Sequence, residues 1–213
     1  MRAAIIDLDG TILDSLDMWN KIDHDFLKLR RGVDVPEDYA RIIAPMTYRE
    51  TAEYTIARFG LTDEPEALMS EWEQMAEDEY RHNILLKPYA REFLLRLREM
   101  GIKTVLCTSS PESYYGPALR RLKVYELFDD FVTTGEVGVS KHFPDVFLLA
   151  AKKAGVDPKD CTVFEDIPDA IMGAKKAGMR TCGVYDPRSA GEMDSMRHIC
   201  DKYIMTLEDF FEE

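Results

Sequence analysis

Short apolar runs alternate with amphipathic stretches along most of this chain. The apolar runs predict buried strands near residues 3–7, 103–107, 130–133, 161–165 and 180–184. The amphipathic stretches predict helices near residues 89–100, 112–123, 144–154 and 168–177. Several of these helices begin at a proline and end at a glycine, as helices commonly do. Strands that alternate with helices in this order predict an α/β fold built on a parallel sheet.

One long segment breaks this alternation, because its pattern is helical throughout. It follows the first strand, and its helices are expected near residues 16–29, 47–59 and 64–80. The sequence therefore predicts a core formed by residues 1–14 and 83–213 and a helical insert formed by residues 15–82. The joints between them are short, which favours a hinged lid over a loosely tethered domain.

Two acidic residues follow the first strand directly, in the order Asp7, Leu8, Asp9, Gly10, Thr11. Side chains two residues apart in an extended segment point to the same face, and Thr11 is expected to add a hydroxyl nearby. Burying two carboxylates so close together costs several kcal/mol unless a cation or a proton lies between them. A calcium loop is disfavoured by the preceding apolar run and the missing terminal Glu. A pair that merely caps a turn is the remaining alternative.

Polar residues also follow two other predicted strands and precede a predicted helix. Thr108 and Ser109 follow the second strand, Glu165 and Asp166 follow the run at 161–165, and Lys141 comes just before a proline-started helix. Singly, each has an ordinary explanation as a strand-end hydroxyl, a solvated lysine or a helix-start charge. Together they predict one site, because ligands of parallel α/β sheets bind at the carboxyl ends of the strands.

The segment from Asp7 to Ser15, DLDGTILDS, resembles the first motif of the haloacid dehalogenase (HAD) superfamily, in its phosphatase and β-phosphoglucomutase-like branch. The other three motifs follow in the family's order, so the resemblance covers essentially the whole chain. It implies a Rossmann-like parallel sheet core with an inserted all-helical cap. It further implies a Mg²⁺-dependent phosphatase that hydrolyses a small phosphomonoester, such as a sugar phosphate, a phosphoglycolate-like acid or a nucleotide.

The resemblance also implies roles for the residues at the strand ends. Asp7 matches the nucleophile that forms an aspartyl-phosphate, Asp9 matches the acid/base, and Lys141 matches the lysine that offsets negative charge. Mg²⁺ is expected on Asp7, the Asp9 backbone carbonyl and Asp166, with Glu165 as a weaker candidate ligand.

Three further positions are expected to contact the substrate. Thr108 and Ser109 match the residues that hold the phosphoryl oxygens. Arg49, in the segment that runs from Ala44 to Glu50, matches an arginine that grips a second phosphate in β-phosphoglucomutase-like members. A surface ion pair between Arg49 and Glu53 is an equally open interpretation.

A sugar phosphomutase of the β-phosphoglucomutase kind is the alternative function. Thr11 stands where such mutases typically carry valine, and Trp19 stands where they carry a gating histidine, so both residues favour hydrolysis. A non-catalytic regulator on the same fold is disfavoured by the complete set of site residues. Dehalogenase chemistry is disfavoured by the second aspartate, and phosphonatase chemistry by the lack of a matching cap lysine. Two departures from the family pattern are His142 after the motif lysine and Glu112 near the second motif.

Composition limits the possible partners. The net charge of −13 disfavours nucleic acid and anionic membranes, and no run of 18 apolar residues occurs. The expected partner is a small phosphorylated metabolite, and the expected protein is a cytoplasmic monomer or homodimer. The four cysteines lack metal-site spacing and are expected to be reduced thiols, most of them buried.

Overall fold

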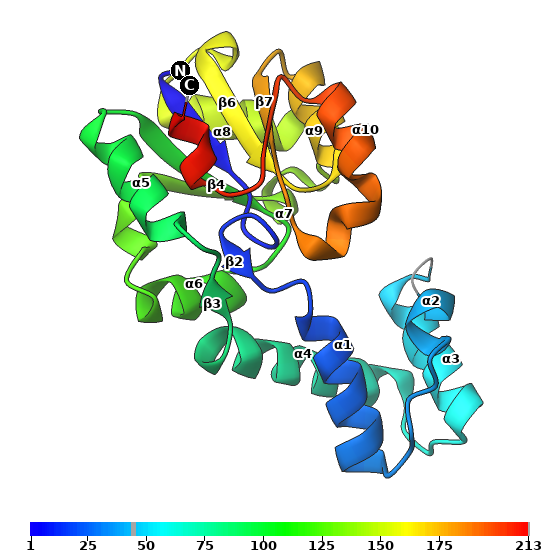
Figure 1. Cartoon of the computed structure of the whole chain (residues 1–213). Coiled ribbons are helices and arrows are strands. Elements are labelled where there is room, and N and C mark those ends of the chain that lie inside the picture. Colours follow the sequence, from blue (N-terminus) through cyan, green and yellow to red (C-terminus); the bar gives the residue numbers. More distant parts are fainter. Residues whose placement is uncertain (44–45, 213) are drawn as a thin grey trace. The chain divides into compact units, whose positions relative to one another are not determined.

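The computed structural model describes residues 1–43 and 46–212 (Figure 1). The chain divides into two compact units. The core unit comprises Met1–Leu16 and Ile84–Glu213, and the helical unit comprises Asp17–Asn83.

The core unit is built on a six-stranded sheet in which all neighbouring strands are parallel. Its strands are β1 (Ala3–Ile6), β4 (Lys103–Thr108), β5 (Asp130–Thr133), β6 (Cys161–Glu165), β7 (Arg180–Val184) and β8 (Lys202–Ile204). The order across the sheet is β5-β4-β1-β6-β7-β8. The predicted α/β class with a parallel sheet is confirmed, and β8 is a sixth strand that the sequence pattern did not indicate. The chain order reverses direction beside β1, which places a switch point between β1 and β6.

Helices cover both faces of this sheet (Figure 1). The helices of the core unit are α5 (Ala90–Glu99), α6 (Glu112–Arg121), α7 (Thr134–Val137), α8 (Asp145–Ala154), α9 (Pro168–Lys176) and α10 (Met193–Ile199), with short 3₁₀ segments η2 (Tyr125–Leu127), η3 (Pro158–Asp160), η4 (Pro187–Glu192) and η5 (Glu208–Phe211). Buried side chains of α8 and α9 pack on one face, against Ile5, Val105 and Val163. On the other face, Phe93 of α5 meets Phe164 edge-on with ring centroids 5.0 Å apart.

The central strands align the residues that follow them. β1 is completely buried, as expected for a parallel strand covered on both faces. Ile6 pairs with Leu106 on one side and Phe164 on the other. The Asp7 N–H continues this register by donating to the Phe164 carbonyl at 3.0 Å. The carboxyl ends of β1, β4 and β6 therefore lie at one edge of the sheet.

A two-stranded ribbon lies where the chain leaves and re-enters the core unit. It consists of β2 (Leu13–Asp14) and β3 (Leu85–Leu86), which pair in antiparallel orientation. Each strand has only two residues, too short for an alternating pattern to reveal it from sequence.

The helical unit contains α1 (Met18–His24), the π-helical η1 (Asp25–Arg30), α2 (Tyr39–Ile43), α3 (Tyr48–Phe59) and α4 (Pro65–His82). The single helix expected at 16–29 is thus divided into α1 and η1, and α2 was not foreseen. Thr47 and Glu50 form a capping box that starts α3. Ala44 and Pro45 of the expected substrate-contacting segment lie outside the described residues. Among the helices described, none combines the length and apolar character needed to cross a membrane.

The cysteines are free thiols, as expected. Cys107, Cys161 and Cys182 are buried, and Cys200 is half-buried. Burial raises the pKa of Cys107 to about 12, so this thiol stays protonated at neutral pH. A catalytic cysteine is accordingly not supported.

Candidate active site

A cavity of about 240 Å³ lies at the carboxyl ends of the central strands. Seven residues expected from the sequence line it: Asp7, Asp9, Thr108, Ser109, Lys141, Glu165 and Asp166. Leu16, Ile167 and Ser189 complete the lining. Arg49 is the one expected site residue that this cavity lacks, because it belongs to α3 of the helical unit.

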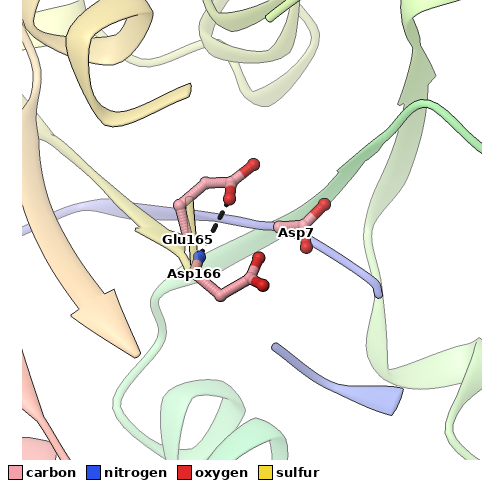
Figure 2. A group of neighbouring side chains, drawn as sticks. All are labelled: Asp7, Glu165 and Asp166. Atoms are coloured by element: carbon pink, nitrogen blue, oxygen red, sulfur yellow. Dashed lines mark hydrogen bonds between the residues drawn. The ribbon is translucent and has the colours of Figure 1, made fainter. Parts of the chain in front are cut away.

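Three buried carboxyl groups form the centre of the cavity. Asp7, Glu165 and Asp166 each place a carboxylate oxygen within 4.8 Å of the others (Figure 2). Glu165 Oε2 accepts the backbone N–H groups of Asp166 at 2.9 Å and Ile167 at 3.3 Å. The loop after β6 is thereby held by the side chain of the residue that ends the strand.

Lys141 is the cation that faces this cluster. Its buried Nζ donates to Asp7 Oδ1 and, at 2.7 Å, to Glu165 Oε1. A close backbone approach positions its loop, since a Cβ at Gly173 of α9 would lie only 1.9 Å from the Lys141 carbonyl oxygen. Position 173 must therefore be glycine for Lys141 to reach the carboxylates.

One ammonium does not balance three carboxyl groups in a buried site. Burial, reinforced by the charge of Glu165, raises the pKa of Asp7 to about 7. Burial and the charges of Glu165 and Asp7 raise the pKa of Asp166 to about 9. Burial alone would lower the pKa of Lys141, but Asp7 and Glu165 outweigh it and hold that pKa well above its usual range. The site thus has an excess of negative charge that favours uptake of protons or of a cation.

A divalent metal fits this donor set. The cluster offers only oxygen ligands, which Mg²⁺ prefers. Both Glu165 oxygens already accept hydrogen bonds, from Lys141 and from backbone N–H groups. Asp7 and Asp166 are therefore the better direct ligands, and Glu165 is better suited to positioning Lys141.

Two hydroxyl groups hold the Asp9 carboxylate. Ser15 Oγ donates to Asp9 Oδ1 and Ser110 Oγ donates to Asp9 Oδ2, each at 2.7 Å. The Ser110 N–H in turn donates to Thr108 Oγ1 at 2.9 Å, which closes the turn after β4. Thr11 differs from expectation: it is fully buried and is not among the residues that line the cavity.

A second lysine, the half-buried Lys87, supports the loop that carries the two aspartates. Lys87 Nζ donates to the carbonyl oxygens of Gly10 at 2.6 Å and Tyr185 at 2.7 Å, and to Asp186 Oδ2 at 2.8 Å. Gly10 has a φ of +85°, and a Cβ there would lie 2.5 Å from Asp166 Oδ2. Lys87 therefore ties the loop after β1, which packs on Asp166, to the loop after β7.

Sequence reasoning missed Lys87, Asp186 and Ser189. Asp186 comes two residues after β7, and Asp7 comes directly after β1, so an acid soon after a strand was an available signal. Lys87 carries no comparable signal in the sequence. Its acceptors are the carbonyl groups of Gly10 and Tyr185 and the carboxylate of Asp186, which lies 99 positions away. Ser189 Oγ lies 3.5 Å from Asp166 Oδ2 and comes from η4, which the pattern did not indicate.

In this chain an Asp-x-Asp pair, a lysine and a second acidic pair meet at one edge of a parallel sheet. This arrangement indicates a class of hydrolase. The profile of that class, the haloacid dehalogenase-like hydrolases, matches residues 1–178. The chain belongs to this family, which confirms the resemblance noted from its motifs.

Named relatives refine this assignment. The chain is 28% identical over 198 residues to the phosphorylated carbohydrates phosphatase of Thermotoga maritima, covering 90% of this chain and 89% of the relative. It is also 28% identical over 184 residues to the phosphoglycolate phosphatase of Pseudomonas fluorescens, covering 84% and 67%. The crystal structure of β-phosphoglucomutase from Clostridium difficile matches with a TM-score of 0.71 and 19% identity, covering 100% of this chain and 94% of that one. Both relatives are named as phosphatases, in agreement with the expected phosphoric monoester hydrolase.

Replacing Lys87 by Met should destabilise the core unit by roughly 3–5 kcal/mol, because Asp186 would stay buried without its cation. Urea denaturation followed by circular dichroism measures this loss. Lys103→Met is the matched control, since it removes an exposed ion pair with Asp129 and should cost less than about 1 kcal/mol. Equal losses in the two variants would contradict a supporting role for Lys87.

Proposed function

We propose that this protein is a Mg²⁺-dependent phosphatase that hydrolyses a small phosphomonoester through an aspartyl-phosphate on Asp7. The observation that carries the proposal is the meeting of Asp7, Lys141 and Asp166 in one buried cluster at the switch point of the sheet, with Asp9 lining the same cavity. The family membership and the names of the curated relatives support it.

In the first step, a carboxylate oxygen of Asp7 attacks phosphorus, and the bond between phosphorus and the leaving-group oxygen breaks. Asp9 donates a proton to that oxygen, so the product leaves as a neutral alcohol. The hydroxyls of Ser15 and Ser110 hold the Asp9 carboxyl group in one orientation for this transfer.

In the second step, water attacks the phosphorus of the aspartyl-phosphate. Asp9, now ionised, accepts a proton from that water, and the bond between phosphorus and Asp7 breaks to release phosphate. Asp9 ends the cycle protonated and Asp7 ends it as a free carboxylate, so both residues are ready for another turnover.

Charge compensation is the main task of the remaining residues. Lys141 bonds Asp7 directly and would offset charge on the phosphoryl group as well. Thr108 and Ser109 would bind the phosphoryl oxygens from the end of β4. Mg²⁺, held by Asp7, the Asp9 backbone carbonyl and Asp166, would neutralise phosphate charge and fix the in-line geometry.

The helical unit would serve as the cap that selects the leaving group. The two named phosphatase relatives differ in that part of the substrate, one acting on phosphorylated carbohydrates and the other on phosphoglycolate. Arg49 would grip a second phosphate only after releasing its present partners, since it donates to Glu66 at 2.6 Å and lies 3.6 Å from Glu53.

Asp7→Asn should abolish turnover and leave the fold intact, because the amide keeps the shape of the side chain but cannot attack phosphorus. Acid quench of the wild type with ³²P-labelled substrate should trap a protein-bound phosphate that hydroxylamine releases. Asp9→Asn should keep some labelling but slow turnover by about 10²–10⁴-fold. Labelling of Asp7→Asn at the wild-type level would remove Asp7 from the nucleophile's role.

Chelation by EDTA should stop phosphate release, and Mg²⁺ should restore it. Mg²⁺ should also raise the unfolding temperature of the wild type, since a ligand that binds only the folded state stabilises it. Asp166→Asn should lose most of both effects. Asp169→Asn is the matched control, because Asp169 is exposed in the first turn of α9 and does not line the cavity. Full activity in EDTA would contradict the metal assignment.

A phosphatase and a phosphomutase differ in their response to a sugar bisphosphate. We expect steady phosphate release from monoesters without bisphosphate stimulation, because Trp19 replaces the residue expected to restrain Asp9 in a mutase. Phosphate release and isomerised product are measured in the same assay. Conversion of β-glucose 1-phosphate to glucose 6-phosphate that depends on bisphosphate, with little free phosphate, would establish the mutase instead.

A further inference from the structure

The loop that carries Lys141, residues 140–143, lies along one face of α9. Asp169, Gly173 and Lys176 are spaced four and three residues apart in this helix, so they share that face. Gly173 makes the closest approach, since a Cβ there would lie 1.9 Å from the Lys141 carbonyl oxygen. The backbone of the loop therefore lies directly on the helix, with a charged residue of α9 on either side of the point of contact.

Lys176 is the side chain that holds this loop on α9. Its Nζ donates to the carbonyl oxygen of His142 at 3.0 Å and lies 3.0 Å from the His142 ring nitrogen Nε2. It also lies 5.9 Å from the ring centroid of Phe143, within reach of a cation–π interaction. One ammonium group thus contacts both of the residues that follow Lys141 in the chain.

These contacts define the tautomer of the His142 ring. An ammonium group can only donate, so Nε2 must accept and the ring proton must be on Nδ1. Asp169 Oδ1 lies 3.6 Å from Nδ1, where its negative charge favours a proton. Within the described part of the chain, Lys176 and Asp169 are the charged side chains that contact this ring, and both belong to α9.

The arrangement around His142 is sensitive to pH. Imidazole is the side chain whose charge ordinarily changes between pH 5 and pH 8. Protonation of Nε2 would remove the acceptor for Lys176 and would place two positive charges 3.0 Å apart. Asp169 would at the same time attract the charged ring. The contact between Lys176 and His142 would therefore weaken as the pH falls.

We propose that Lys176 is a positioning residue for Lys141, which it acts on through the neutral form of His142, and that acid releases the loop by protonating His142. Lys141 Nζ reaches Asp7 and Glu165 from this loop, so its place in the cavity depends on where the next residue is held. The effect on catalysis rests on the proposed phosphatase function, whereas the effect on the loop does not.

Nitrogen NMR of the histidine rings tests the contact without reference to activity. At pH 8 the His142 proton should be on Nδ1, and Lys176→Met should remove this preference. The His142 signals are assigned by their absence from His142→Gln. His198 is an internal control, because its Nδ1 bonds the Asp194 carbonyl oxygen at 2.6 Å and should keep its proton in both proteins. A wild-type His142 with its proton on Nε2 would overturn the proposal.

Hydrogen exchange followed by mass spectrometry tests whether the contact holds the loop. Lys176→Met should exchange the amides of residues 140–143 about 5-fold faster than the wild type at pH 8, because a hydrogen-bonded support is lost. Lys175→Met is the matched control, since it removes an exposed lysine from the same turn of α9 and should leave this exchange unchanged. Equal exchange in the wild type and in Lys176→Met would contradict the proposal.

Kinetics test the link to Lys141. With Mg²⁺ present, Lys176→Met should release phosphate from para-nitrophenyl phosphate about 10-fold more slowly than the wild type at pH 8, since small displacements of a positioned group are costly. Lys176→Arg should restore most of the rate, because a guanidinium can donate to both acceptors of His142. Lys175→Met should keep the wild-type rate. Equal rates for Lys176→Met and Lys175→Met would refute the positioning role and leave the phosphatase function standing.

The pH profile tests the part played by the imidazole. Glutamine can accept a hydrogen bond from Lys176 but does not titrate. His142→Gln should match the wild type at pH 8, and its advantage should rise as the pH falls to 5.5, toward the loss seen in Lys176→Met. Ionisations of the active site are common to both proteins and cancel in this ratio. A ratio that stays constant would refute release by acid. Absence of phosphate release by the wild type would refute the proposed function, and the ring tautomer and loop exchange would still decide this inference.

Discussion

The crowding of buried carboxyl groups at the ends of β1 and β6 is the constraint on which the site depends. Parallel pairing brings Asp7 beside the loop after β6, and the fold adds Glu165 and Asp166 within a few ångströms. Such a cluster would oppose folding without compensation. Lys141 supplies one positive charge, and the raised pKa values of Asp7 and Asp166 show that a demand for further positive charge remains. The empty site already has an excess of negative charge. A dianionic phosphate would add to that excess, so the site is suited to phosphate only when a further cation is bound.

Two lysines, the buried Lys141 and the half-buried Lys87, support this cluster in different ways. Lys141 contacts the carboxylates themselves, and Gly173 gives its loop the room to do so. Lys87 pairs with Asp186 outside the cluster and also fixes the backbone carbonyl of Gly10, and so the turn between Asp7 and the ribbon. Lys87 also follows β3, through which the chain re-enters the core unit. The turn after Asp7 is thereby fixed at the same point where the chain re-enters the core unit.

Most of the sheet could be predicted from sequence, and so could the meeting of seven of the eight expected site residues in one cavity, because both follow from local pattern. Buried strands are apolar runs, and parallel strands bring the residues at their carboxyl ends together whatever lies between. The features that the sequence did not predict depend on contacts between distant residues. Lys87 has a supporting role only because Tyr185 and Asp186 lie against it in the folded chain. β8 has three residues and one buried side chain, too few for periodicity to be visible. Only one partner of Arg49 could be predicted from sequence. Glu53 lies four residues later on the same helix, α3, whereas Glu66 belongs to α4.

Under the proposed function, the chemistry of the phosphoryl group and the choice of substrate would be separated in this chain. Residues of the core unit would carry out attack, proton transfer and charge compensation, and they would serve any phosphomonoester. Discrimination among substrates has to come from groups that meet the leaving part, and such discrimination is strong when an unmatched ligand leaves a polar group unpaired. In the core cavity three carboxyl groups face one lysine, so under the proposed function negative charge on the substrate is tolerable only on the phosphoryl group, where Lys141 and the proposed metal would neutralise it.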